Sequence, residues 1–197
     1  MRNEPLPNVE HRRCALALAL IATFAASNAQ SSPTQDDPRS NAATRLFLEV
    51  CANNIGDERK VRAWVADRGL QALAPALAEK VLQGKAGEVW SASNGIGDFL
   101  IVAQSPQQCS VWARKANTRI SFEQFQKYVH DVERPGLTVS LHSDREVEAK
   151  DGRYRVVAYT IARENAGSAF LLEAITLDAP TAQVQVRLKF AQVKLPE

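Results

Sequence analysis

Two histidines are the residues best suited to acid–base chemistry in the chain beyond its first 29 residues. His142 and Asp144 are two positions apart in a segment whose apolar and polar residues alternate, so their side chains share one solvated face of an expected strand. This spacing indicates a wet sheet face rather than a hydrolase site. His130 lies beside Asp131 near the end of an expected surface helix, where a histidine interacts with the helix carbonyls without a catalytic purpose.

A row of carboxylates follows His142 on the same expected strand. Asp144, Glu146 and Glu148 lie on one side of it and are of the type that holds a hard cation such as calcium. Same-face neighbours on a strand are about 7 Å apart, whereas calcium–oxygen distances are about 2.4 Å. We therefore expect exposed charges, no metal and no cofactor. Arg145 falls in the apolar register, and we expect a strand end or a structural ion pair there.

The sequence lacks the motifs of common enzyme classes. It contains no G-x-S-x-G, no G-x-x-x-x-G-K-[ST], no H-E-x-x-H and no G-x-G-x-x-G. Gly95-Ile96-Gly97 is a loop between two expected strands, without the helix start that binds a phosphate. The 24 basic and 22 acidic residues give a formal net charge of +2, without the excess typical of nucleic-acid binding. We expect neither an enzyme nor a nucleic-acid partner.

The amino terminus has the three parts of an export signal. Residues 1–13 are net positive, residues 14–26 are apolar, and Ser27-Asn28-Ala29 supplies the small residues that a signal peptidase requires. The apolar run is shorter than the roughly 20 residues that span a membrane. Cys14 lies at its start, which argues against lipid attachment. We expect cleavage after Ala29, export to the periplasm and no stable membrane anchor.

The remaining chain divides into two parts. Residues 30–41 are polar, contain two prolines and are expected to be a flexible leader. Residues 42–197 are expected to form a single domain, long enough to bury a core without help from a metal or from oligomerisation. Residues 1–29 are the expected signal peptide.

Cysteine counting predicts one disulfide. Once Cys14 leaves with the signal, Cys51 and Cys109 remain in a compartment that favours oxidation. A reactive or metal-binding pair would need a short spacing such as C-x-x-C or nearby histidines, and neither is present. We therefore expect these two cysteines to have a structural role.

Helical and strand periodicities come in blocks. Three short helices are expected first, followed by three strands, one helix and four strands. The later helix is expected to begin at a capping box of Ser121 and Gln124 and to end before Pro135. Because the strands arrive in runs, we expect an α+β fold: an antiparallel sheet of about seven strands, in a three-stranded and a four-stranded meander, packed with about four helices. The expected helices cover residues 44–54, 57–69, 75–82 and 121–134; the expected strands cover residues 88–92, 98–103, 109–114, 137–148, 154–163, 169–177 and 182–193.

An aromatic and basic edge is the candidate binding surface. The loop after Trp90, together with Trp112 and Arg114 on a neighbouring strand, suits recognition of a protein partner. The alternative is that the tryptophans belong to the core, where such residues are more often found. The residues assigned to the surface are Trp90, Asn94, Ile96, Asp98, Trp112 and Arg114.

Several stretches resemble a family of exported proteobacterial proteins, many of them lipoproteins. The resemblance covers most of residues 46–162 and is carried by FLEVCANNIGDERKVRAW, VWSASNGIGDFLIVAQ, CSVWARKA, GLTVSLHSDREV and GRYRVVAY. Members carry a cysteine pair that matches Cys51 and Cys109, in agreement with the expected disulfide. This chain lacks a lipobox, so it resembles a soluble periplasmic form. The resemblance implies no catalytic residues and no function.

Two functions from different classes fit these features. The first is a periplasmic protein that binds another protein, most concretely an immunity or inhibitor protein that occludes the active site of an envelope-acting toxin. The second is an accessory factor of envelope assembly or a small-ligand carrier, with its site in a groove between helices and sheet. An inhibitor would present an exposed loop or sheet face, and a carrier a deep apolar cavity. A hidden enzyme would instead have a cleft holding His130 or His142 with a perturbed carboxylate.

Overall fold

The structure is a computed structural model that describes residues 36–149, 151–164 and 166–194. The expected signal peptide, with Cys14 and the cleavage position after Ala29, lies outside these residues, as does the leader up to residue 35. Within the described part of the chain, no helix has the length and apolar character needed to span a membrane.

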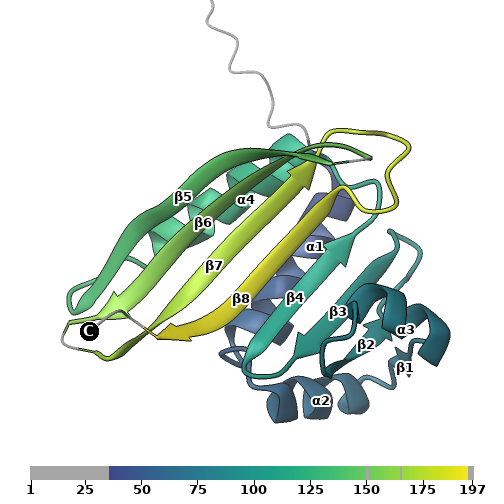
Figure 1. The fold of residues 1–197 in the computed structure, drawn as a ribbon, viewed down its shortest axis with the longest axis horizontal. Helices are drawn as coiled ribbons and strands as arrows, with labels where there is room; N and C mark the ends of the chain where they lie inside the picture. Colours follow the sequence, from purple (N-terminus) through teal and green to yellow (C-terminus); the bar gives the residue numbers. More distant parts are fainter. Residues whose placement is uncertain (1–35, 150, 165, 195–197) are drawn as a thin grey trace, which may run out of the picture. The chain divides into compact units, whose positions relative to one another are not determined.

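Eight antiparallel strands form one sheet, in the order β1-β2-β3-β4-β8-β7-β6-β5 (Figure 1). The first four strands and the last four each form a meander, and the two meanders join where β4 pairs with β8. The predicted α+β class and antiparallel sheet are confirmed. The strands are β1 (Gln71–Ala72), β2 (Gly87–Ser91), β3 (Phe99–Gln104), β4 (Gln108–Ala113), β5 (Leu137–Ala149), β6 (Gly152–Arg163), β7 (Ser168–Leu177) and β8 (Val186–Lys194).

The additional strand, β1, was not expected from the sequence. It consists of two exposed residues that pair with Ser91 and Trp90 at the edge of β2. So short a segment has no alternation of apolar and polar residues, because both of its side chains face solvent. The meander expected to have three strands therefore has four.

Five helical segments of the described residues accompany the sheet. The first two, α1 and η1, follow each other without a break, and η1 is a π-helix. The predicted helix ending before Pro135 is confirmed, with Asp131 as its last residue. The segments are α1 (Pro38–Leu46), η1 (Phe47–Ala52), α2 (Glu58–Asp67), α3 (Pro75–Leu82) and α4 (Thr118–Asp131).

The first helix begins earlier than expected. Residues 38–41, assigned to the flexible leader, are helical. The Asp37 carboxylate accepts a hydrogen bond from the backbone N–H of Ser40, and Pro38 occupies a first-turn position that needs no N–H donor. The polar composition of this segment reflects a capped helix start rather than a leader.

The predicted capping box at Ser121 is wrong. The α4 cap is Asn117, whose side chain accepts from the N–H of Ile120 at 3.0 Å. Ser121 lies within the first turns of α4, fully buried, and its hydroxyl donates to the Ser40 hydroxyl of α1 at 2.9 Å. This serine joins two helices instead of ending one.

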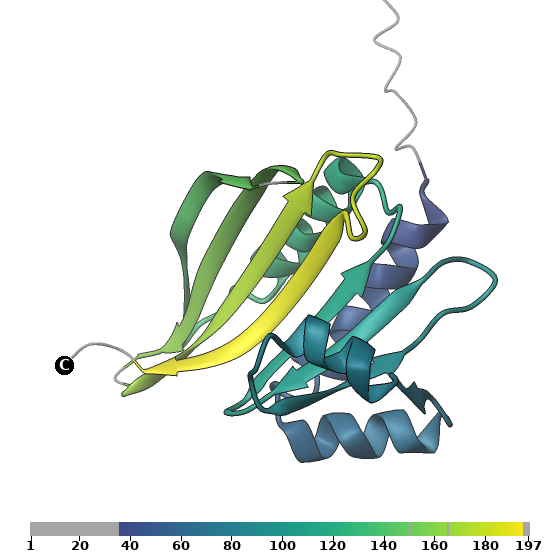
Figure 2. The ribbon, with the colours of Figure 1, turned by 45° about the vertical axis from the view of Figure 1, so that its right-hand side comes forward.

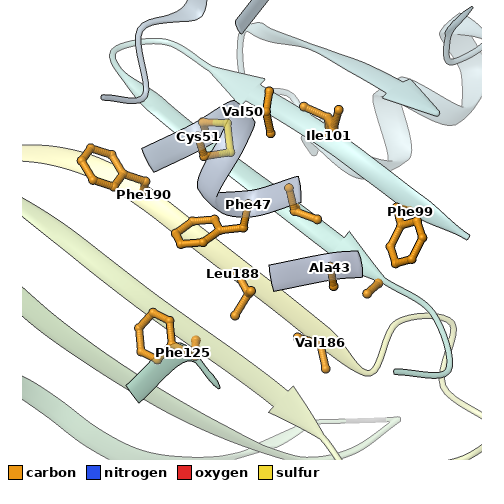
Figure 3. Close-up of a cluster of buried hydrophobic side chains, with 14 of the residues drawn as sticks. Ala43, Phe47, Val50, Cys51, Phe99, Ile101, Phe125, Val186, Leu188 and Phe190 are labelled. Atoms are coloured by element: carbon orange, nitrogen blue, oxygen red, sulfur yellow. A yellow bond between two sulfur atoms is a disulfide. The ribbon is translucent and has the colours of Figure 1, made fainter. Parts of the chain in front are cut away.

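The helices cover the two faces of the sheet unequally. Figures 1 and 2 show α1 and α4 on one side of the strands. Figure 3 shows Phe47, Phe125 and Leu188 gathered between these helices and the sheet, in a cluster that also includes residues of α2. On the opposite side, α3 packs against β2 and β3, where Leu82 contacts Val89 and Val102. Figure 1 shows β5 to β8 on that side without a helix in front of them.

A disulfide joins the first helical block to the sheet. Cys51 in η1 and Cys109 in β4 are bonded, with their Cα atoms 5.2 Å apart, and both are fully buried. The prediction of this pair is confirmed. Because the bond closes a loop, it restricts the conformations of the unfolded chain and stabilises the folded state by on the order of 4 kcal/mol.

Candidate functional site

The predicted aromatic edge is divided, because its two tryptophans lie on opposite faces of the sheet. Trp90 pairs with Ile101 of β3, and Trp112 pairs with Leu100. Consecutive residues of a strand point to opposite faces, so the two indole rings do too. Trp90 is only 5% exposed and belongs to the core on the helix-covered face. Its assignment to a binding surface is therefore wrong.

Part of the predicted surface does come together on the other face. Asp98, Trp112 and Arg114 line one hollow of about 440 Å³, together with Leu100 and Gln183. This hollow lies where the β2–β3 loop, the end of β4 and the segment before β8 meet.

The loop between β2 and β3 positions the remaining predicted residues. The Asn94 side-chain oxygen accepts from the backbone N–H groups of Ile96 at 2.8 Å and of Gly97 at 3.2 Å, which shapes the turn. Ile96 is 42% exposed at its tip. Asn94 therefore has a structural role, and Ile96 is accessible at the edge of the sheet.

The side of the sheet that carries Trp112 is the candidate site, and we refer to it below as the open face. Residues paired across antiparallel strands share a face, so the pairing of β4, β8 and β7 places two rows of side chains next to each other. One row consists of Trp112, Arg187 and Ile175; the next consists of Ser110, Lys189 and Glu173.

Arg187 and Trp112 form a stacked pair at the centre of the open face. The guanidinium carbon lies 4.2 Å from the centre of the indole ring, a cation–π geometry. The indole N–H donates to the Ser110 hydroxyl at 3.0 Å, which fixes the ring. A rigid aromatic ring thus supports a cation on the surface of the sheet.

Arg187 is half-buried, and one nitrogen of its guanidinium lacks a polar partner. Its Nε has no hydrogen-bond partner, the one buried side-chain nitrogen or oxygen of the described residues for which this is true. Burial lowers the pKa of the guanidinium, and the nearby Tyr154 and Asp151 only partly offset this effect. Because arginine stays charged in proteins, the result is a poorly solvated positive charge.

The second row contains an ion pair. Lys189 Nζ lies 2.5 Å from Glu173 Oε1, and these side chains are 23% and 12% exposed. A hollow of about 140 Å³ lies beside this pair and Arg187, at the end of α3. Its lining residues are Val81, Leu82, Gln83, Lys85, Gln104, Gln108, Ser110, Trp112, Glu173, Ile175, Arg187 and Lys189. This arrangement suits recognition of a charged group.

The histidine and the carboxylates of β5 that the sequence singled out lie on an edge strand of the sheet. β6 lies between β5 and β7, the nearest strand that lines this hollow. A bulge between Leu141 and Ser143 leaves His142 without a partner residue on β6. Because one extra residue moves later side chains to the other face, Arg145 lies on the face opposite Leu141. It is exposed there, so its expected place in the apolar register is wrong.

The bulge also moves the β5 carboxylates to the helix side of the sheet. Asp144 pairs with Arg155 at 2.9 Å, while Glu146 and Glu148 lie 3.3 and 2.6 Å from Arg153. The hydrogen bond from Arg155 lowers the pKa of Asp144. Across the described ranges, no group of three His, Cys, Asp or Glu side chains is placed to hold a metal ion.

The histidines do not form a catalytic site with these groups. His130 is exposed on α4, and His142 is exposed at the β5 bulge. Neither lies among the residues that line the hollows of the open face. The structure gives them no role in the candidate site.

Comparison with known protein families finds no match to this chain, and comparison with curated proteins finds none either. The likeness to exported proteobacterial proteins therefore stays a prediction, and any assignment of function rests on the residues of the open face.

Proposed function

We propose that this protein is an exported, non-enzymatic binding protein whose open face binds another protein. The observation that carries the proposal is the stacked pair of Trp112 and Arg187 on a face of β4, β8 and β7. Tryptophan and arginine are the residue types that contribute most often to binding energy at protein interfaces. Because strands hold both side chains, little conformational entropy is lost on binding.

The specific form of the proposal is an immunity or inhibitor protein that neutralises a toxin acting in the cell envelope. The predicted signal peptide and the buried disulfide support an extracytoplasmic site of action. A sheet face with hollows on both sides of Trp112 is the kind of surface that covers a partner's active site. The partner's chemistry would then define the biological role.

The alternative roles have less support. A small-ligand carrier would need a deep apolar cavity between helices and sheet, but Phe47, Phe125 and Leu188 fill the centre of that layer and are almost fully buried. The hollow of about 200 Å³ that lies between α1, α2 and the end of β2 is smaller than the roughly 300 Å³ at which small-molecule sites begin. An accessory role in envelope assembly would use the same open face with a different partner, so the identity of the partner separates it from the immunity role.

The test is a pull-down from envelope extracts with the mature, oxidised protein, followed by reconstitution with the purified partner. We expect one partner at fixed stoichiometry, and at least a tenfold loss of affinity for Trp112→Ala. Leu141→Ala is the matched control, because Leu141 is an exposed apolar residue (58%) on β5 outside the open face.

Two outcomes would contradict the proposal. Equal retention of the partner by the wild type and Trp112→Ala would place the interface elsewhere. A small molecule that raises the melting temperature, with no protein retained, would favour the carrier.

A further inference from the structure

The open face contains a charged atom that the fold does not satisfy. Arg187 Nε is buried and lacks a hydrogen-bond partner, and among the described residues no carboxylate forms a salt bridge with this guanidinium. Buried polar atoms of native proteins are nearly always paired, and an unpaired one calls for an explanation such as a missing ligand. For a guanidinium, the matching ligand is an oxyanion.

The charges around Arg187 indicate an anion rather than a cation or a neutral group. Lys189 is already bonded to Glu173 at 2.5 Å. Arg187 and Lys85 are the other charged residues that line the hollow, so its net formal charge is positive. Asp151 acts on Arg187 through space but forms no salt bridge with it, so an incoming carboxylate would meet a guanidinium to which no carboxylate of the described residues is directly bonded.

The size of the hollow selects a single side chain over a free metabolite. Its volume of about 140 Å³ is below the roughly 300 Å³ at which small-molecule sites begin. The Trp112 ring and the Ile175 side chain border it and suit the apolar stem of an acidic residue. Glu173 is close by and would repel a doubly charged phosphate more than a singly charged carboxylate.

We infer that this hollow binds the side-chain carboxylate of an acidic residue on a protein partner, with the Arg187 guanidinium as its donor and Trp112 as its support. The inference rests on the proposed function for the kind of molecule that carries the carboxylate. It adds the chemistry of recognition: the partner presents a Glu or Asp to the centre of the open face.

The test uses a capped peptide of alternating Gly and Glu as the probe. Its counterparts are the same peptide with Gln in place of Glu, and inorganic phosphate at equal ionic strength. The readout is the arginine Nε–Hε resonance of Arg187 in the ¹⁵N-labelled mature protein, assigned by its loss in Arg187→Met. We expect the Glu peptide to shift this resonance in a saturable manner, and the Gln peptide to leave it in place.

Variants provide a second, independent readout by binding affinity. We expect Arg187→Met to weaken binding of the Glu peptide at least tenfold, and Arg187→Lys severalfold, because lysine keeps the charge but loses the forked donor. Arg163→Met removes the same charge from the exposed end of β6 and should bind within twofold of the wild type. If Arg187→Met does not fold, the affinity of Arg187→Lys for the Glu peptide provides the test.

Three results would overturn the inference: an Arg187 resonance that the Glu peptide does not move, phosphate bound more tightly than the peptide, or equal binding by Arg187→Met. If a partner is captured through Trp112 but the Glu peptide leaves the Arg187 resonance in place, the carboxylate site is overturned and the proposed function stands. A Glu peptide bound at Arg187 with no protein partner found would support the carboxylate site and count against the proposed function.

Discussion

The helix-covered face and the open face of the same sheet differ in how their polar groups are satisfied. On the covered side, the buried hydroxyls of Ser40 and Ser121 bond to each other, and Ser40 also donates to a carbonyl oxygen. On the open side, Arg187 Nε has no partner. Polar groups that serve the fold are completed within the chain, so an incomplete one in the same molecule indicates a surface kept for binding.

The sharpest test of this comparison uses two adjacent leucines of β7. Leu172 is fully buried on the helix-covered face, while Leu171 is partly exposed on the opposite face. We expect Leu172→Ala to lower the free energy of unfolding by about 4 kcal/mol, through lost burial and a cavity, and Leu171→Ala by about 1 kcal/mol. Urea unfolding measures both. Equal losses would show that the open face is also core.

Removal of the disulfide tests how strongly the covered face depends on its covalent link. We expect the double variant Cys51→Ala, Cys109→Ala to lose about 4 kcal/mol of unfolding free energy. Reduction of the disulfide in the wild type should lower its free energy of unfolding by a similar amount. A variant as stable as the wild type would mean that packing alone holds η1 on β4.

Replacement of Arg187 should raise the free energy of unfolding rather than lower it. Because Arg187→Met removes a half-buried charge that forms no salt bridge within the described residues, we expect the free protein to become more stable by about 1 kcal/mol while losing its binding function. Thermal unfolding in the absence of any ligand measures this change. A destabilised Met variant would indicate that the guanidinium serves the fold rather than a partner.

Acid unfolding gives the smallest expected effect. Burial opposes ionisation of Asp37, but hydrogen bonds from Ser40 and Asn117 outweigh it and hold the pKa of Asp37 below its ordinary 3.8. A lowered pKa stabilises the folded state above pH 3.8, and this contribution is lost as the pH falls through the folded value. We expect Asp37→Asn to flatten that part of the pH–stability curve. An unchanged curve would exclude this carboxylate as its source.

The fold class could be predicted because it depends on local signals. Alternating side chains in β8 and the run of short strands before and after α4 indicate an antiparallel sheet, and counting cysteines identified the disulfide. Gln185 shows the limit of this reasoning. Alternation places it outward, yet it is 6% exposed, because its amide donates to the carbonyl oxygens of Ala179 and Ala182.

The candidate site was only partly predictable. Trp112 was singled out, but its partner Arg187 was not, because their contact depends on the pairing of β4 with β8, which no local pattern encodes. The bulge at His142 was also not predictable from the sequence. A one-residue insertion reverses every later side chain of β5, and a polar residue there leaves no visible break in the alternation.

The pairing of β4 with β8 also governs the order in which the sheet can assemble. β8, in the middle of the sheet, comes after the other seven described strands in the sequence, so the two meanders remain separate until β8 pairs with both. A chain cut after Leu177 would leave β4 and β7 as two bare edges, each open to pairing with another molecule. Contacts this distant in sequence make folding slow, which lengthens the time during which the incomplete chain depends on chaperones and is open to proteases.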